Sequence, residues 1–138
     1  LLRLPFIGWY SKYAGHFLLD RDNPREGKRV LDSAVARAKR HGLCPLVFAE
    51  GTRTRDGKLA EFKTGAFQLA ISAGIPVQPV AVLGSYDLMP RGALAPGRSG
   101  TIVLRVGEPI PIEGLKGSPG RKALAAKVRQ ALYDMGVA

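Results

Sequence analysis

The sequence predicts an α/β fold in which a mostly parallel central sheet is flanked by helices. Three consecutive segments support that class. Residues 43–49 form a short continuous apolar run, which is typical of a strand buried on both faces of a parallel sheet. Apolar residues with helical spacing follow in residues 64–72, and a second apolar run covers residues 77–82. A strand, a helix and a strand joined by short connections predict a right-handed βαβ unit.

The segment before this unit is predicted to contribute a short strand, residues 17–19, and an amphipathic helix. Asn23 is expected to cap that helix, Pro24 to occupy its first position, and Gly42 to end it. Basic residues cover much of its surface; such a face is most often solvated, although it would also suit anionic lipid. The apolar residues with helical spacing, expected to be buried, are Val30, Leu31, Ala34, Val35 and Ala38.

In the central helix, Thr64 is expected to be the N-cap and Gly74 to end the helix. After the βαβ unit, residues 84–100 are rich in Gly, Pro and Arg, which favours a mobile surface loop. Residues 101–106 alternate between apolar and polar and predict a half-exposed strand near a sheet edge. A last helix is expected to begin at Ser118-Pro119, to end at Gly136 and to bury a stripe made of Leu124, Val128, Leu132 and Met135.

Length and composition indicate one domain, residues 1–138, with a hydrophobic fraction of 46% that suits a globular chain. The 21 Lys and Arg residues exceed the 11 Asp and Glu residues, which leaves a net charge of +10. That excess implies a negatively charged partner: nucleic acid, an anionic membrane surface or a phosphorylated substrate. Charge alone does not choose among the three.

The single cysteine, Cys44, excludes a disulfide framework and a cysteine-based metal site, and it is expected to be a buried thiol. No uninterrupted apolar run approaches the roughly 20 residues that a spanning helix requires. The chain starts at Leu1 and enters dense apolar and aromatic sequence at once. We therefore expect that an N-terminal portion of the domain is missing.

A cluster of polar residues follows the first apolar run of the βαβ unit. Gly51 permits close backbone approach, Thr52 offers a hydroxyl, and Arg53 offers a planar guanidinium that pairs well with phosphate oxygens. Lys63 adds a second cation. From the residues alone, the group predicts either a phosphate pocket or a structural ion pair between Glu50 and Arg53, at near parity.

Three blocks resemble the glycerolipid acyltransferase family, which comprises the 1-acyl-sn-glycerol-3-phosphate acyltransferases and their relatives. Residues 48–54, Phe-Ala-Glu-Gly-Thr-Arg-Thr, are similar to the family's Phe-Pro-Glu-Gly-Thr-Arg-Ser, with Ala49 and Thr54 as small departures. Residues 15–21 resemble the preceding block, and residues 75–81 resemble the fourth block, Val-Pro-Ile-Val-Pro-Val. The blocks have the family's order and spacing, and the resemblance covers most of the chain up to Gly107.

The resemblance implies a glycerol-3-phosphate acyltransferase-like fold and a reaction in phospholipid synthesis. An acyl group would pass from a thioester, either acyl-CoA or acyl carrier protein, to the hydroxyl of a lysophosphatidic acid-like acceptor, 1-acyl-glycerol-3-phosphate. That thioester is a co-substrate, and neither a cofactor nor a metal is expected. Glu50 would order the loop and hydrogen-bond the acceptor. The resemblance places the acceptor phosphate on Arg53, assisted by Gly51, Thr52, Lys63 and Arg21, and the acyl chain beside Pro76 and Pro79.

One departure from the family is large. Its catalytic pair, His-x-x-x-x-Asp, in which the histidine is the general base, does not occur among the 138 residues. His16 and Asp20 are one residue too close, and His41 has Leu46 at the required position. In the family the pair lies upstream of the block matched by residues 15–21. We therefore expect an N-terminally truncated domain that is inactive alone, with its catalytic residues unknown and His16 structural.

The resemblance also implies a location at the cytoplasmic face of a membrane, where the basic charge would hold the domain against anionic lipid. Two alternatives stay open. One is a non-catalytic phosphate- or lipid-binding module of the same fold. The other is a basic nucleic-acid-binding domain, although the Lys and Arg residues are dispersed and no RNP, zinc-finger or KH motif occurs, so no nucleic-acid partner is expected. The sequence does not predict an oligomeric state.

Overall fold

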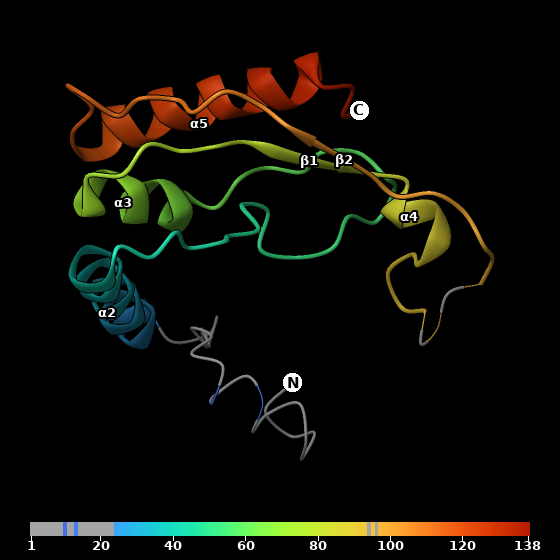
Figure 1. Cartoon of the computed structure of the whole chain (residues 1–138), viewed down its shortest axis with the longest axis horizontal. Helices are drawn as coiled ribbons and strands as arrows, with labels where there is room; N and C mark the ends of the chain where they lie inside the picture. Colours follow the sequence, from blue (N-terminus) through green and yellow to red (C-terminus); the bar gives the residue numbers. More distant parts are fainter. Residues whose placement is uncertain (1–9, 11–12, 14–23, 94, 96) are drawn as a thin grey trace. The chain divides into compact units, whose positions relative to one another are not determined.

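The computed structural model (Figure 1) describes residue 10, residue 13 and residues 24–93, 95 and 97–138. The chain divides into two compact units, Leu1–Pro45 and Leu46–Ala138. The predicted strand at residues 17–19 lies outside the described residues, as do the Asn23 cap, His16 and Arg21.

The described part of the first unit is dominated by helix α2 (Pro24–His41), which confirms the predicted amphipathic helix. Ala34 and Ala38 are buried on its apolar face, and three further residues are half-buried. The last turn is basic, and its positive charges interact favourably with the negative end of the helix dipole. Gly42 follows with a φ of 60°, a left-handed conformation that ends the helix as predicted. The three half-buried residues of that face are Val30, Leu31 and Val35.

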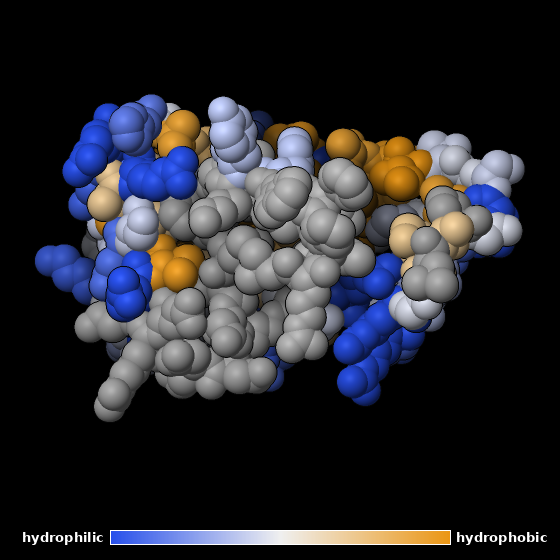
Figure 2. Space-filling model, turned by 90° about the horizontal axis from the view of Figure 1, so that it is seen from below, coloured by the Kyte–Doolittle hydropathy of each residue, from blue (hydrophilic) through white to orange (hydrophobic). Residues whose placement is uncertain are grey.

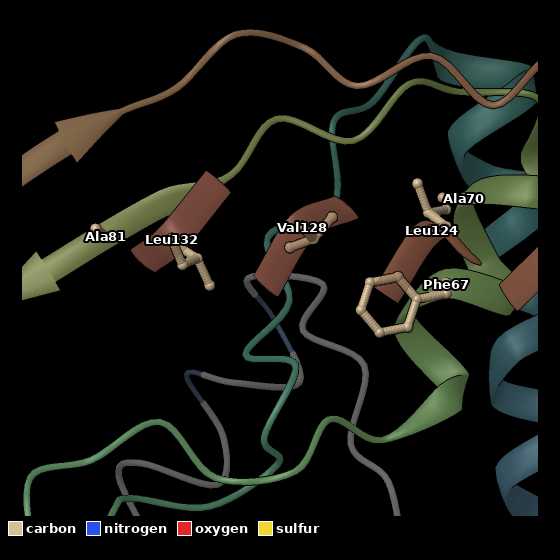
Figure 3. Close-up of a cluster of buried hydrophobic side chains, with 6 residues drawn as sticks. All are labelled: Phe67, Ala70, Ala81, Leu124, Val128 and Leu132. Carbon is tan, nitrogen blue, oxygen red and sulfur yellow. The ribbon is translucent and has the colours of Figure 1, made fainter. Parts of the chain in front are cut away.

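The core of the second unit is formed by helices α3 (Thr64–Ala73) and α5 (Gly117–Asp134) together with strand β1 (Val80–Leu83). Along α5 the buried stripe runs from Leu124 at the α3 end to Leu132 at the β1 end (Figure 3). Leu124 is 0% exposed, and burying one such side chain contributes about 1.5–3 kcal/mol. The predicted stripe is confirmed for three residues, while Met135 is half-buried. The cluster consists of Phe67, Ala70, Ala81, Leu124, Val128 and Leu132.

Strand β1 pairs antiparallel with β2 (Val103–Val106), so a strand within the predicted residues 101–106 is confirmed, although it begins at Val103 and all four of its residues are exposed. Ala81 opposes Arg105 in the register, and both lie on the face turned to α5. Ala81 is buried there, and Nη1 of Arg105 donates a 2.7 Å hydrogen bond to the carbonyl oxygen of Met135 at the end of α5. On the opposite face the opposed pair Val82 and Leu104 is exposed.

The first predicted strand is wrong for the described structure. Residues 43–49 are irregular, Leu46 is 81% exposed and Phe48 is 75% exposed. Cys44 is likewise exposed rather than buried. An apolar run marks a segment suited to burial, but a strand also needs a neighbour for its backbone N–H and C=O groups. Among the described residues the sheet contains β1 and β2 alone, so its pairing is antiparallel and the parallel βαβ unit is not formed.

Several details of the elements also differ from the prediction. Lys63 is the N-cap of α3, because its φ of −78° and ψ of 133° are extended, and Thr64 is the first helical residue. The predicted strand at residues 77–82 begins at Val80, and Val77 forms an isolated antiparallel bridge with Ile110. The loop at residues 84–100 contains a short helix, α4 (Ser85–Leu88). Gly74 ends α3 with a φ of 75°, as predicted.

The surface carries both strongly hydrophilic and apolar residues, and Figure 2 shows the two kinds next to each other on one face. Several large apolar side chains are exposed in the loop before residue 50 and on strand β2. None of the helices described here combines the length and the apolar composition needed to cross a bilayer.

Candidate functional site

The loop of residues 48–63, which we call the polar loop, is closed by two hydrogen bonds between its ends and has a third within its first turn. The N–H of Ala60 donates to Oε2 of Glu50 at 2.8 Å. The N–H of Lys63 donates to the carbonyl of Ala49 at 2.7 Å, and the N–H of Gly51 donates to the carbonyl of Phe48 at 2.9 Å. Residues 49–51 are therefore held beside residues 60–63, and Glu50 is one of the groups that hold them.

Gly51 and Lys63 are close neighbours in this loop. Gly51 has a φ of 70°, a left-handed conformation that favours glycine. A Cβ atom at Gly51 would lie 3.4 Å from Cγ of Lys63, so the stem of the lysine passes over the glycine. Gly51 is half-buried, and the lysine stem occupies the side of its backbone on which a side chain of residue 51 would lie.

Two of the three cations predicted to bind phosphate, Arg53 and Lys63, have no partner within the described structure. Arg53 and Lys63 are exposed, and neither side chain forms a hydrogen bond or an ion pair with another described residue. The predicted alternative, an ion pair between Glu50 and Arg53, is not formed: the carboxylate accepts from a backbone N–H instead. Thr52 is exposed beside them. The polar loop therefore brings together Glu50, Gly51, Thr52, Arg53 and Lys63.

The far end of the polar loop is a tight turn held by Thr54 and Asp56. Oγ1 of Thr54 accepts from the N–H of Gly57 at 3.1 Å and lies 2.9 Å from the carbonyl oxygen of Lys58. Oδ1 of Asp56 accepts from the N–H of Lys58 at 3.1 Å and lies 3.1 Å from the Thr54 hydroxyl. The Lys58 N–H, and secondarily that hydroxyl, lower the pKa of the Asp56 carboxyl below its ordinary value of 3.8.

Two side chains that support the polar loop were not predicted from the sequence. The hydroxyl of Tyr86 in α4 donates to the carbonyl of Arg55 at 2.9 Å. Arg129 in α5 donates from Nη2 to the carbonyl of Ala60 at 2.7 Å and from Nη1 to that of Leu59 at 3.4 Å. The sequence signal for Arg129 is weak: it follows the buried Val128 and so stands at the border of the helix stripe.

The remaining predicted site residues lie elsewhere on the chain. Pro76 is exposed and Pro79 is buried in the segment that leads into β1. The carbonyl of Pro79 accepts from the N–H of Gly107 at 2.9 Å, which extends the pairing of the two strands by one bond. Arg21 lies outside the described residues.

The chain matches known proteins over most of its length. The family model described as Acyltransferase matches residues 1–83. The 1-acyl-sn-glycerol-3-phosphate acyltransferase of Salmonella typhimurium is 32% identical over 138 residues, which is 100% of this chain and 54% of that protein. A 1-acyl-sn-glycerol-3-phosphate acyltransferase of Chlamydomonas reinhardtii is 36% identical over 108 residues, which is 78% of this chain and 32% of that protein.

A solved structure shares the fold. The crystal structure of the 1-acyl-sn-glycerophosphate (LPA) acyltransferase PlsC from Thermotoga maritima matches with a TM-score of 0.73 and 30% sequence identity, over 98% of this chain and 53% of that one. This likeness confirms the predicted acyltransferase-like α/β class, although the described strands pair antiparallel. The chain spans 32% of the Chlamydomonas relative and 54% of the Salmonella relative. The chain belongs to the acyltransferase family, and it corresponds to part of the length of these relatives.

Proposed function

We propose that this chain supplies the acceptor-binding part of an enzyme that acylates 1-acyl-glycerol-3-phosphate. The acyl donor is a thioester, either acyl-CoA or acyl carrier protein. Support comes from the relatives, which are named as acyltransferases of that phosphorylated acceptor, and from the polar loop, whose sequence matches the family block that contains Glu50 to Arg53.

The observation that carries the proposal is the exposed, unpaired side chain of Arg53. Its guanidinium is exposed and unpaired within the described structure, yet it stands on a loop whose backbone is fixed by the bonds of Glu50 and Lys63. An unpaired guanidinium on an ordered loop is well suited to bind a phosphate group through two parallel hydrogen bonds. Lys63, whose stem passes over Gly51, contributes a second positive charge to the same loop.

The reaction needs a base as well as an acceptor site. The acceptor hydroxyl oxygen attacks the thioester carbonyl carbon, the carbon–sulfur bond breaks, and the thiol leaves with a proton. The spacing His-x-x-x-x-Asp, which the family uses for proton transfer, does not occur in these 138 residues. We propose that the chain alone binds the acceptor but does not catalyse the transfer, with Glu50 in a supporting role.

The basic charge of the chain favours binding to an anionic membrane. A net charge of +10 attracts the chain to anionic lipid at the cytoplasmic face of a membrane, where a lysophospholipid acceptor is found. The basic last turn of α2 belongs to this charge. Binding of the chain to anionic vesicles, weakening as salt is added, is the expected result; equal binding to neutral vesicles would contradict it.

The acceptor assignment is tested in the full-length enzyme with Arg53→Ala and a matched control, Arg55→Ala. Arg55 is an exposed arginine of the same loop and its removal changes the net charge equally. Loss of a charge-assisted hydrogen bond of 1.5–3 kcal/mol predicts that Arg53→Ala raises the KM for the phosphorylated acceptor about 10- to 100-fold. The KM for the thioester should change little, and Arg55→Ala should leave both values near those of the wild type.

Three outcomes would contradict the proposal. Equal losses toward the acceptor and the thioester in Arg53→Ala would mean that the arginine is structural. A monoacylglycerol acceptor, which has no phosphate, should be used equally by Arg53→Ala and the wild type; a further loss there would also count against phosphate binding. Transferase activity of these 138 residues alone, abolished by His16→Ala, would contradict the expected inactivity of the chain.

A further inference from the structure

Among the described residues, Arg129 is the arginine of α5 whose side chain hydrogen-bonds to the polar loop. Its two terminal nitrogens bind consecutive carbonyls, Nη2 that of Ala60 at 2.7 Å and Nη1 that of Leu59 at 3.4 Å. The guanidinium carbon lies 4.5 Å from the centre of the Phe62 ring, within the range of a cation–π contact. Nη1 also lies 3.2 Å from the hydroxyl of Tyr133 one turn further along the helix.

The peptide groups of Ala60 link this arginine to Glu50. The carbonyl of Ala60 accepts from Arg129, and the N–H of the same residue donates to Oε2 of Glu50 at 2.8 Å. Three residues later, the N–H of Lys63 binds the carbonyl of Ala49. A rigid helix is thus connected through a single residue of the loop to the segment that contains Arg53.

We infer that Arg129 is a positioning residue of the acceptor site, an inference that rests on the proposed function. It holds Leu59 and Ala60 so that the Ala60 N–H stays directed at Glu50, and Glu50 in turn keeps Gly51 to Arg53 in place. Arg129 itself binds no substrate. Its planar fork is required because it reaches two carbonyls while stacking on Phe62, an arrangement that a lysine ammonium cannot reproduce in full.

The test uses the full-length enzyme and two substitutions of the residue, Arg129→Met and Arg129→Lys. Methionine keeps much of the apolar stem and removes both hydrogen bonds, while lysine keeps the charge and one bond. The matched control is Arg121→Met: Arg121 is also a half-buried arginine of α5, but its Nη1 binds Oε1 of Gln68 in α3 instead of the polar loop.

The first measurement is backbone amide hydrogen exchange of residues 58–63. Arg129→Met should raise exchange in this segment by about tenfold, the effect of losing roughly 1.4 kcal/mol of local stability. Arg121→Met should leave it unchanged, and Arg129→Lys should fall between the wild type and Arg129→Met. Unchanged exchange in Arg129→Met would overturn the inference, because the arginine would then not hold the loop.

The second measurement is the KM for the phosphorylated acceptor and for the thioester. Arg129→Met should raise the acceptor KM about 3- to 10-fold, with kcat and the thioester KM within about twofold of the wild type, and Arg129→Lys should recover part of the loss. In an E50A background, Arg129→Met should change the acceptor KM less than about twofold, because the effects of substitutions along one chain of contacts are not additive. Equal effects of Arg129→Met in both backgrounds would overturn the inference.

The measurements of Arg53→Ala with the two acceptors distinguish the proposed function from the role of Arg129. If Arg53→Ala fails to act selectively on the phosphorylated acceptor, the proposed function fails whatever Arg129 does. If Arg53→Ala acts selectively while Arg129→Met leaves the acceptor KM unchanged, the proposed function stands and the role of Arg129 as a positioning residue is overturned.

Discussion

The backbone N–H of Ala60 donates a 2.8 Å hydrogen bond to Oε2 of Glu50, ten residues earlier in the chain. This contact decides between two interpretations of Glu50. A carboxylate that binds a backbone N–H orders a loop, whereas a carboxylate paired with Arg53 would neutralise the guanidinium. Glu50 is engaged with the backbone and forms no ion pair with Arg53, whose guanidinium is unpaired within the described structure.

Substitutions of Glu50 should therefore separate its hydrogen bond from its charge. Glu50→Gln keeps a side-chain carbonyl that can accept from Ala60, while Glu50→Ala removes the acceptor. Glu50→Ala should lower the free energy of unfolding by about 1 kcal/mol and Glu50→Gln by less than half of that. Chemical denaturation of the full-length protein measures both. Equal losses would show that the negative charge, not the bond to Ala60, matters.

Glycine at position 51 should be required for the shape of the polar loop. Gly51 has a φ of 70°, where an L-residue is strained, and an added Cβ would meet Cγ of Lys63 at 3.4 Å. Gly51→Ala should lower the free energy of unfolding by about 1 kcal/mol. Gly65→Ala is the control, because Gly65 is helical and a Cβ there would meet nothing within 4 Å. That variant should be neutral or slightly more stable, and a loss as large as that of Gly51→Ala would contradict the backbone explanation.

The core of the second unit should depend strongly on Leu124. This side chain is 0% exposed and packs in the cluster with Phe67 and Ala70. Leu124→Ala should lower the free energy of unfolding by about 2–5 kcal/mol through lost burial and the cavity left behind. Lys122→Ala, on the exposed face of the same helix, should change it by less than about 0.5 kcal/mol. Thermal or urea unfolding compares the two, and a small loss in Leu124→Ala would place the leucine outside the core.

The turn at residues 54–58 should weaken in acid. The folded-state pKa of Asp56 is lowered by the Lys58 N–H and the Thr54 hydroxyl, so the carboxylate favours the folded turn. Its contribution is complete above the unfolded pKa of about 4 and is lost as the pH falls through the lower folded value. A carbon-detected NMR titration should give a pKa for Asp56 below 3.8. A value at or above 3.8 would contradict these contacts.

The control for that titration is Thr54→Val, which removes the hydroxyl and keeps the β-branched shape. It should move the pKa of Asp56 upward, because one of the two hydrogen bonds to the carboxylate is lost, while the Lys58 N–H keeps part of the shift. An unchanged pKa would show that the backbone N–H accounts for the whole effect.

Helices α2, α3 and α5 could be predicted from the sequence because their causes are local. The spacing of Ala34 and Ala38, and of Leu124, Val128 and Leu132, repeats every turn, and a glycine follows each predicted end. The polar loop could also be predicted, as a contiguous block that matches the family. The partner of Glu50 could not be predicted, since a carboxylate can accept a hydrogen bond either from the guanidinium of Arg53 or from the N–H of Ala60.

The sequence by itself determined helices α2, α3 and α5, a strand within residues 101–106, the polar loop and the resemblance to the acyltransferase family. Only the tertiary structure decided that β1 pairs antiparallel with β2, that residues 43–49 are irregular, and that Arg129 holds the carbonyl of Ala60 from 69 residues away. The physical reason is the range of the contacts. Helical periodicity and glycine ends act within a few residues, whereas strand pairing and a guanidinium on a distant carbonyl depend on which segments meet in space.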